Sequence, residues 1–257
     1  METPEEMTAD RTSVELRQRV DQLERELAQV QLALEDFTYS VSHDLRASLR
    51  HVTAYLRIAR EDLGDALDPA VANHLDTAAG AATRMGRLMD GLMELSRVGR
   101  AVLQPGVVDL GALLDDVRHH LEPACERRAL RWHVAPDLPR VRGDLALLNQ
   151  LLTSLVDNAI KFSRDRDMAE ITIGWSPLDQ PGMCEIHVQD NGVGFDPRMQ
   201  DRLFRVFQSL HSAREFDGIA VGLALARRVV ERHGGQIRAH GEPGQGCRIS
   251  FSLPLAV

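Results

Sequence analysis

A histidine followed directly by an acidic residue is the first place where this chain could do chemistry. Residues 40–50 read SVSHDLRASLR, with His43 and Asp44 side by side. Val41 belongs to an apolar helical stripe, so His43, two residues on, is expected to turn away from that stripe toward water. An exposed imidazole on a rigid helix is a candidate nucleophile, and the neighbouring carboxylate could orient it and take its proton. Of the ten histidines, the other nine have no chemical partner at an informative spacing.

A second candidate site lies in the segment GDLALLNQLLTSLVDNAIKFS, residues 143–163, whose broad apolar face predicts a helix. The amide oxygen of Asn158 is a hard ligand of the kind that Mg²⁺ prefers. Lys161 follows three residues later on the same helical face, where its ammonium group can reach a phosphate. The pair is therefore suited to a phosphate group that carries a metal ion.

Two glycine-containing segments follow in the order that a nucleotide site would need. DNGVGF comes directly after an expected strand, so Asp190 can accept a hydrogen bond from the amino group of a base, and Gly192 and Gly194 allow the backbone to approach its ring. GIAVGLALARR opens a helix, where Gly218 and Gly222 expose backbone N–H groups to phosphate. Each feature alone is common in turns and at helix starts. Together, and after the His-Asp helix, they indicate nucleotide-dependent chemistry.

A heptad seam precedes the histidine and predicts a coiled coil. Apolar residues recur in steps of four and three, with Glu, Arg and Gln between them, at Leu16, Val20, Leu23, Leu27, Val30, Leu34, Phe37 and Val41. A 3.5-residue repeat keeps one narrow stripe facing a partner helix. The alternative is an amphipathic helix that packs on its own domain, but the narrow stripe favours a partner, and a parallel homodimer is the natural one.

The elements that must position these residues divide the chain into five parts. We expect a flexible tail over 1–13, the coiled coil over 14–40, a helical hairpin over 41–98, a linker over 99–106 and a mixed domain over 107–257. Gly64 and the segment GDALDP break the first helix, and Pro69 suits the first turn of the second. Two hairpins from two chains would close a four-helix bundle.

The last 150 or so residues mix helical and strand patterns and predict an α+β fold in which helices cover one face of a sheet. Strands are expected at VVDL, LRWHV, EITIGW, CEIHVQD and on both sides of the turn in QIRAHGEPGQGCRISFSLP. Helices are expected at GALLDDVRHHLEPACERRA, at residues 143–163 and at VGLALARRVVERHGG. This domain would hold all the nucleotide-site candidates, while His43 lies on the hairpin.

Composition excludes several other classes of protein. The net charge of −8 argues against nucleic-acid binding through charge alone. Cys125, Cys184 and Cys247 lie far apart and form no CxxC pair, which argues against a disulfide framework or a structural zinc site and fits a reducing compartment. No uncharged run approaches the length of a membrane span, and the acidic N-terminus has no apolar signal core. The sequence therefore predicts a cytoplasmic protein.

These motifs resemble those of the histidine kinases of two-component signalling, and the resemblance covers nearly all of residues 35–255. SVSHDLRASLRHV is similar to the family's phospho-acceptor box, LLTSLVDNAIKF to its N box, DNGVGF to its G1 box and GIAVGLALARRVVERHGG to its G2 box. LFRVFQSLHSAREFDG resembles the F box and ATP lid, with features of phytochrome-type kinases. The resemblance implies a dimeric phosphotransfer bundle followed by an Hsp90-like ATP-binding α/β sandwich.

The resemblance also implies a role for each candidate residue. His43 would be phosphorylated through Nε2, with Asp44 orienting its other nitrogen and acting as base. Within the ATP site, the resemblance implies that Asn158 binds Mg²⁺ and that Lys161 contacts phosphate. Asp190 would recognise the adenine amino group, and Gly192 and Gly194 would shape the adenine pocket. Gly218 and Gly222 would frame the phosphates. Residues 204–218 would form a lid. The implied reaction moves the γ-phosphoryl group of MgATP to His43 and then to an Asp of a response regulator.

Four departures from the family pattern keep a second function open. Ser48 stands where a helix-bending Pro is usual, and Ala47 where phosphatase-active kinases have Thr or Asn. Ser154 replaces an Asn of the N box, and Ala220 replaces the middle glycine of the G2 box, where a positive φ would strain it. The alternative is a degraded kinase that serves as a dimeric signalling scaffold. A third hypothesis is a different ATPase that shares the α/β sandwich. The helix that carries His43 and Asp44 argues against this hypothesis.

No sensor is recognisable in the first 40 residues. They hold only the polar tail and the coiled coil. Either the chain is part of a longer protein, or its input comes from a partner that docks on the helix.

Overall fold

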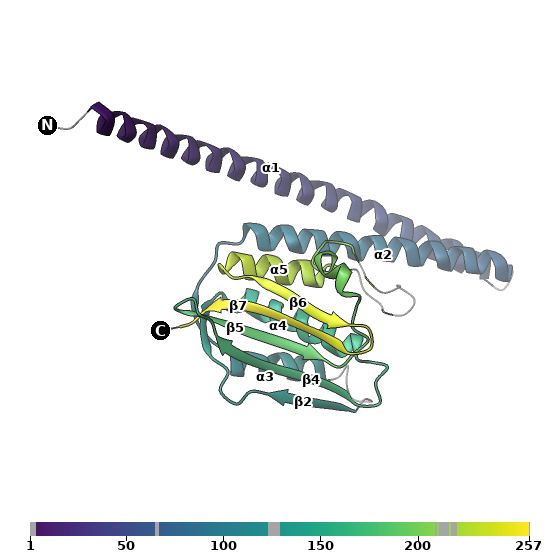
Figure 1. Cartoon of the computed structure of the whole chain (residues 1–257). Helices are drawn as coiled ribbons and strands as arrows, with labels where there is room; N and C mark the ends of the chain where they lie inside the picture. The colour runs from purple at the N-terminus through teal and green to yellow at the C-terminus, as the bar shows by residue number, and fades with distance from the viewer. Residues whose placement is uncertain are drawn as a thin grey trace.

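The computed structural model describes residues 4–64, 67–122, 129–208, 210, 216 and 220–256. Two long helices, α1 (Pro4–Leu63) and α2 (Pro69–Arg100), lead into an α/β domain. In chain order its elements are β1 (Gly106–Asp109), α3 (Leu110–Leu121), β2 (Leu130–Val134), β3 (Arg140–Gly143), α4 (Leu145–Phe162), β4 (Ala169–Pro177), β5 (Met183–Asp190), the 3₁₀-helix η3 (Pro197–Arg202), α5 (Gly222–Arg232), β6 (Ile237–Glu242) and β7 (Gly246–Pro254). Figure 1 shows this order along the chain.

A single helix, α1, carries both the heptad seam and His43. It begins at Pro4, so residues expected in a flexible tail are helical from that point, and it continues without interruption past Ser48. Large apolar side chains of the seam are exposed in the isolated chain: Val20, Leu23, Leu27, Val30, Leu34, Phe37 and Val41. An apolar stripe of this kind is expected to be covered by a partner, and the homodimer stays a prediction.

The second helix folds back on the first as the sequence predicts. Asp68 caps α2, because its carboxylate accepts a hydrogen bond from the N–H of Ala70 at 2.8 Å, and Pro69 occupies the first turn. α2 ends at Arg100, one residue beyond the glycine expected to stop it. Its last residue pairs with α1, where Arg100 Nη1 lies 3.0 Å from Asp36 Oδ1. The two helices therefore form a hairpin.

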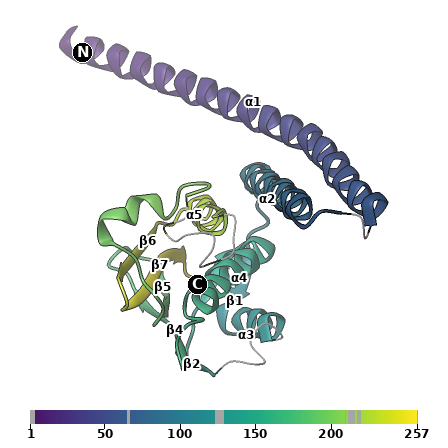
Figure 2. The same ribbon diagram turned by 90° about the vertical axis from the view of Figure 1, so that its right-hand side faces the viewer.

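One five-stranded sheet organises the α/β domain, in the order β2-β4-β5-β7-β6. β2 and β4 are parallel, and the other pairs are antiparallel. Helices α3, α4 and α5 cover one face, as the sequence predicts (Figures 1 and 2). The sequence reading missed β3, which pairs with β1 in a separate two-stranded sheet. Four residues between a proline and an N-capping aspartate give too short a pattern to identify a strand from sequence.

The core lies between this sheet and the three helices. Its largest fully buried side chains alternate along β4, β5 and β7 and along the inner face of α4, and they include Ile171, Ile173, Ile186, Phe251, Leu148 and Leu151. Val98 of α2 belongs to the same cluster and is completely buried. The hairpin is therefore joined to the α/β domain by apolar packing near the end of α2.

Polar contacts reinforce this junction. Arg232, the last residue of α5, donates hydrogen bonds from Nη1 to the carbonyl oxygens of Val98 at 2.5 Å and Gly99 at 3.0 Å. Gln150 Nε2 of α4 donates to Glu94 Oε1 at 2.5 Å. Both views place α2 between α1 and the α/β domain (Figures 1 and 2). Across the described residues, none of the helices combines the length and apolarity needed to span a bilayer.

Candidate nucleotide cavity and phospho-acceptor histidine

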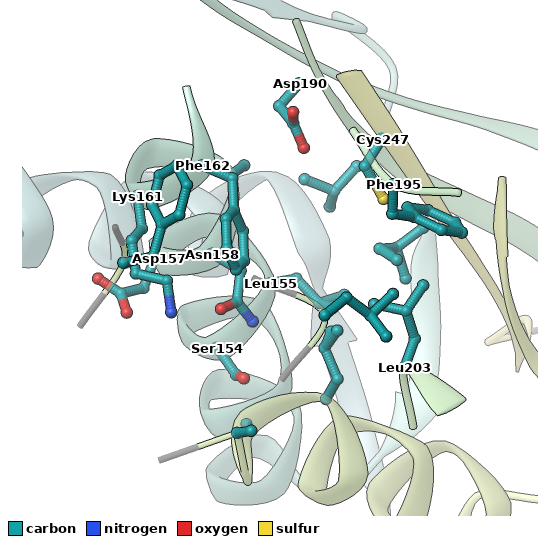
Figure 3. A pocket seen from close by; sticks show the side chains of 18 of the residues that line it. Ser154, Leu155, Asp157, Asn158, Lys161, Phe162, Asp190, Phe195, Leu203 and Cys247 are labelled. Atoms are coloured by element: carbon teal, nitrogen blue, oxygen red, sulfur yellow. The ribbon is translucent and has the colours of Figure 1, made fainter. Parts of the chain in front are cut away.

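A cavity of about 260 Å³ opens between α4, the start of α5 and the inner face of β5 and β7. Five of the candidate residues line it: Asn158, Lys161, Asp190, Gly194 and Gly222. In Figure 3, Asp190 and Cys247 lie on the strand side, and Ser154 and Asn158 lie on the α4 side. The tertiary fold thus gathers residues that are more than sixty positions apart in the sequence.

Asp190, the last residue of β5, has a carboxylate that is almost completely buried from solvent. Only 7% of its surface is exposed, and burial raises its pKa to about 6, although hydrogen bonds from backbone N–H groups and the charge of Arg166 oppose that rise. The N–H of Gly192 donates to Asp190 Oδ1 at 2.8 Å. One carboxylate oxygen is therefore fixed by its own loop. The group is available to accept a hydrogen bond from a ligand when it is ionised.

Close backbone packing explains two of the predicted glycines. A Cβ atom at Gly192 would come within 2.4 Å of the carbonyl oxygen of Phe162, so no larger residue fits there without movement. Gly194 has a φ of +64°, and a Cβ atom there would lie 1.9 Å from the carbonyl oxygen of Glu242. These glycines hold the loop after β5 against the end of α4 and the β6–β7 hairpin.

Arg166 fastens the same loop and was not identified from the sequence. Its Nε donates to the carbonyl oxygen of Asn191 at 2.7 Å, and Nη2 donates to that of Gly192 at 3.0 Å and also to that of Gly244. The guanidinium thus joins the loop after β5 to the β6–β7 turn. Arg166 belongs to none of the recognised motifs, and its contacts are spaced 25 to 78 residues away, so no local signal marks it.

The opposite end of the cavity is built by α4 and the start of α5. Asp144 caps α4, with Oδ1 accepting hydrogen bonds from the N–H groups of Ala146 and Leu147. One wall is very tight, since a Cβ atom at Gly222 would lie 2.7 Å from Ser154 Oγ and 3.6 Å from Asn158 Nδ2. Ser154 Oγ is buried and has no hydrogen-bond partner among the described residues.

Aromatic rings cover the end of α4 that carries Lys161. Lys161 Nζ lies 4.5 Å from the centre of the Phe162 ring, which packs against Phe216 with 5.0 Å between ring centres. Arg164 lies 4.5 Å over the other ring, that of Phe216. Phe216 is buried, so this residue of the expected lid contributes a wall of the cavity. The neighbouring Gly218, and most of the expected lid beyond Gln208, lie outside the described residues.

Ala220 has a left-handed backbone conformation. Its φ is +50°, in the left-handed region that alanine adopts only at a cost. Its carbonyl oxygen accepts a hydrogen bond of 3.0 Å from the N–H of Phe207, which is also left-handed with a φ of +63°. The condition under which the sequence predicts strain at position 220, a positive φ, is therefore met in the structure. The hydrogen bond joins the backbone of Phe207 to that of Ala220, which lines the cavity.

His43 lies on the exposed surface of α1, as predicted. Its side chain is 64% exposed, and Nδ1 lies 3.2 Å from Asp44 Oδ1. With the proton on Nδ1, the imidazole donates to the carboxylate, and Nε2 carries the lone pair. Among the described residues, none from α1 or α2 lines the cavity. The helix that carries His43 therefore contributes nothing to the cavity wall, and α2 lies between that helix and the α/β domain (Figures 1 and 2).

Comparison with known proteins accounts for both parts of the molecule. The His Kinase A (phospho-acceptor) domain family matches residues 33–101, and the histidine kinase-, DNA gyrase B- and HSP90-like ATPase family matches residues 143–257. The chain is a histidine kinase core of two-component signalling. The match to the ATPase family follows the match to the phospho-acceptor family along the chain, and the cavity lies within the region matched by the ATPase family.

Individual relatives match almost the whole chain. The methanogenesis regulatory histidine kinase FilI of Methanothrix harundinacea is 34% identical over 95% of this chain, and the phytochrome-like protein Cph1 of Synechocystis is 31% identical over 91%. This kinase core spans only 27% and 31% of those two proteins. The crystal structure of full-length ShkA in complex with AMPPNP superimposes with a TM-score of 0.61 at 25% identity, covering 86% of this chain and 46% of ShkA.

Proposed function

We propose that this kinase core transfers the γ-phosphoryl group of MgATP to Nε2 of His43, and from there to an aspartate of a response regulator. The observation that carries the proposal is the buried Asp190 carboxylate, which faces a cavity that Asn158, Lys161 and Gly222 also line. This arrangement offers one hydrogen-bond acceptor for a base and several polar groups for phosphates. The known complex of ShkA with an ATP analogue supports the same assignment.

Adenine recognition would fall to Asp190. Its ionised carboxylate accepts a hydrogen bond from the exocyclic amino group, and the low local polarity strengthens that bond. The loop around it is already fixed by Gly192 and Arg166, so little order has to be gained on binding. Apolar walls from Val188, Phe195 and Ile249 suit the faces of a flat ring.

The residues at the other end fit a metal-bound triphosphate. Ser154 Oγ is buried and has no hydrogen-bond partner in the described part of the chain, and Gly222 packs closely against it. No group of three His, Cys, Asp or Glu side chains in the described part of the chain could hold a metal. Mg²⁺ would therefore be held by the amide oxygen of Asn158 together with phosphate oxygens, and it would neutralise charge that develops on them. Lys161 and the N–H groups at Gly222 would contact the phosphates.

The transfer itself would use His43 and Asp44. The Nε2 lone pair attacks the γ-phosphorus, the bond to the bridging oxygen breaks, and ADP leaves with that electron pair. Asp44 holds the proton on Nδ1 and stabilises the positive charge that the ring gains as its second nitrogen forms a bond. Because no described residue of α1 lines the cavity, the transfer requires the ATP-binding domain to move relative to α1, or an acceptor His43 from a second chain.

A homodimer and a cytoplasmic location complete the proposal. The exposed heptad seam of α1 supplies the dimer surface, and pairing of two hairpins would form the four-helix bundle. The response regulator would dock on the hairpin, where the phosphorylated histidine is exposed.

Incubation with ATP labelled at the γ-phosphate tests the proposal. We expect acid-labile, alkali-stable label on the protein, and its loss in His43→Gln while ATP binding persists. Label that remains near the wild-type level in His43→Gln would move the acceptor elsewhere, with His51 the next histidine on α1. No label, despite ATP binding, would favour the signalling scaffold, and free phosphate without protein label would favour a plain ATPase.

A further inference from the structure

A groove of about 500 Å³ runs between α1 and α2, close to His43. Three arginines of α1 line it, Arg46, Arg50 and Arg57, and Asp90 of α2 faces them. Three positive charges therefore meet one negative charge on the hairpin surface. The groove begins within one helical turn of the phospho-acceptor residue, since Arg46 is three residues after His43.

Phosphorylation of His43 would bring a negatively charged phosphoryl group close to the carboxylate of Asp44. Asp44 already holds a carboxylate within 3.2 Å of the imidazole, and a phosphoryl group on Nε2 would add further negative charge to the same turn. Nearby like charges disfavour one another unless a cation lies between or beside them. The residues from 39 to 47 contain one cationic side chain besides His43 itself, that of Arg46.

Arg46 is poised for this task. Residues three apart on a helix have Cβ atoms about 5–6 Å from each other, and helical side chains lean toward the N-terminus, so Arg46 leans toward His43. Its side chain is 30% exposed and is ion-paired through Nη2 with Asp90. Its Nε is buried and has no hydrogen-bond partner among the described residues. The guanidinium thus lines the groove and keeps at least one N–H donor, that of Nε, without a partner in the described part of the chain.

We propose that Arg46 binds the phosphoryl group of phosphorylated His43, exchanging its contact with Asp90 for the new dianion. A guanidinium matches phosphate oxygens with two parallel hydrogen bonds, which an ammonium group cannot do. Asp90, 61% exposed, can return to water when it is released. The inference rests on the proposed role of His43. It assigns Arg46 to the phosphorylated state, in addition to its pairing with α2 in the unphosphorylated one.

The test compares phosphorylated wild-type protein with Arg46→Gln, Asp90→Asn and Arg57→Gln. Phosphorylation is reversed by ADP, so the equilibrium between labelled protein plus ADP and free protein plus ATP reports the stability of the phosphoryl group on His43. We expect Arg46→Gln to shift this equilibrium about ten-fold toward ATP. Asp90→Asn frees the guanidinium and should shift it the opposite way or leave it unchanged. Arg57→Gln, which removes the partner of Glu61 farther along the groove, should have no effect.

A spectroscopic readout separates a phosphate contact from a structural role. We expect the midpoint of the ³¹P titration of the phosphorylated histidine to rise by about one pH unit in Arg46→Gln, because a lost cation favours protonation of the phosphoryl group. Equal effects of Arg46→Gln and Asp90→Asn would show that only the interhelical ion pair matters and would overturn the proposal. A midpoint that moves in Arg50→Gln but not in Arg46→Gln would overturn it as well.

The same titration remains available if the kinase reaction fails. Phosphoramidate transfers its phosphoryl group to imidazole nitrogens and releases ammonia, and the signal of His43 is identified as the one missing from His43→Gln. Failure of wild-type labelling by ATP would count against the proposed function alone. An unchanged titration in chemically phosphorylated Arg46→Gln would count against Arg46 alone.

Discussion

Replacing Ala220 by glycine tests how the altered phosphate loop affects ATP binding. The left-handed backbone at Ala220 costs an alanine on the order of 1–2 kcal/mol, and glycine adopts it without strain. Glycine also gives the open loop more conformational freedom, which offsets roughly 0.4–1 kcal/mol of that gain. The net advantage for the backbone that accepts the hydrogen bond from Phe207 to residue 220 is therefore between about 0 and 1.6 kcal/mol.

We therefore expect Ala220→Gly to tighten MgATP binding by a few-fold, and by about 15-fold at most. Calorimetric titration of both proteins, with and without Mg²⁺, measures the change. The gain should appear with and without the metal, because it arises in the backbone of the loop. In contrast, Asn158→Ala should weaken binding mainly when Mg²⁺ is present, since it removes the proposed metal ligand.

Ala101→Gly provides the matched control. Ala101 has a φ of −54°, so the same substitution relieves no strain there and should leave ATP affinity unchanged. If Ala220→Gly binds ATP no more tightly than the wild type, the loop is already formed and adapted to alanine, and the reasoning that links strain to weak binding is wrong. Weaker binding would mean that the methyl group of Ala220 itself contacts the nucleotide favourably.

Three further predictions follow from the fold. Burial raises the pKa of Asp190 to about 6, so in the nucleotide-free protein this group favours folding below its unfolded value and loses that contribution as pH rises through 6. Asp190→Asn should therefore raise the free energy of unfolding at pH 7, measured in thermal melts, by roughly 1–3 kcal/mol, and it should abolish ATP binding. The ATP affinity of the wild type should decrease as the pH is lowered past about 6, where the carboxylate becomes protonated. Equal stability of the two proteins at pH 7 would contradict the burial argument. Light scattering should give twice the chain mass of 28.6 kDa. The double variant Leu23→Glu, Leu27→Glu should weaken the dimer, because it buries unpaired carboxylates in the seam. A monomeric wild type at micromolar concentration would contradict the predicted coiled coil. Dephosphorylation of a regulator should proceed near its intrinsic rate, because Ala47 cannot orient water and the Ser48 hydroxyl donates to the Asp44 carbonyl oxygen at 3.3 Å; a large acceleration by the wild type would point to another water-binding residue.

Local patterns were enough to predict most of the elements, although not β3 or η3, and most of the candidate residues. A heptad repeat is a property of consecutive residues, so the sequence reveals the long helix that carries His43. Likewise, DNGVGF contains glycines that the backbone itself requires, at positions where a Cβ atom would strike a neighbouring carbonyl oxygen. Chemistry that depends on short segments can be read from those segments, and this is why Asp190, Asn158 and Gly222 were found before the fold was known.

Only the tertiary structure decided how these segments act on one another. The raised pKa of Asp190 comes from burial beneath helices and strands distant in the chain. Arg166 reaches a loop 25 residues away and a turn 78 residues away. That Ser154 Oγ has no hydrogen-bond partner among the described residues is evident only when α5 lies against α4. The position of α2 between α1 and the α/β domain likewise depends on long-range packing around Val98. Such contacts follow from which surfaces exclude water together, and a sequence pattern limited to neighbouring residues does not contain that information.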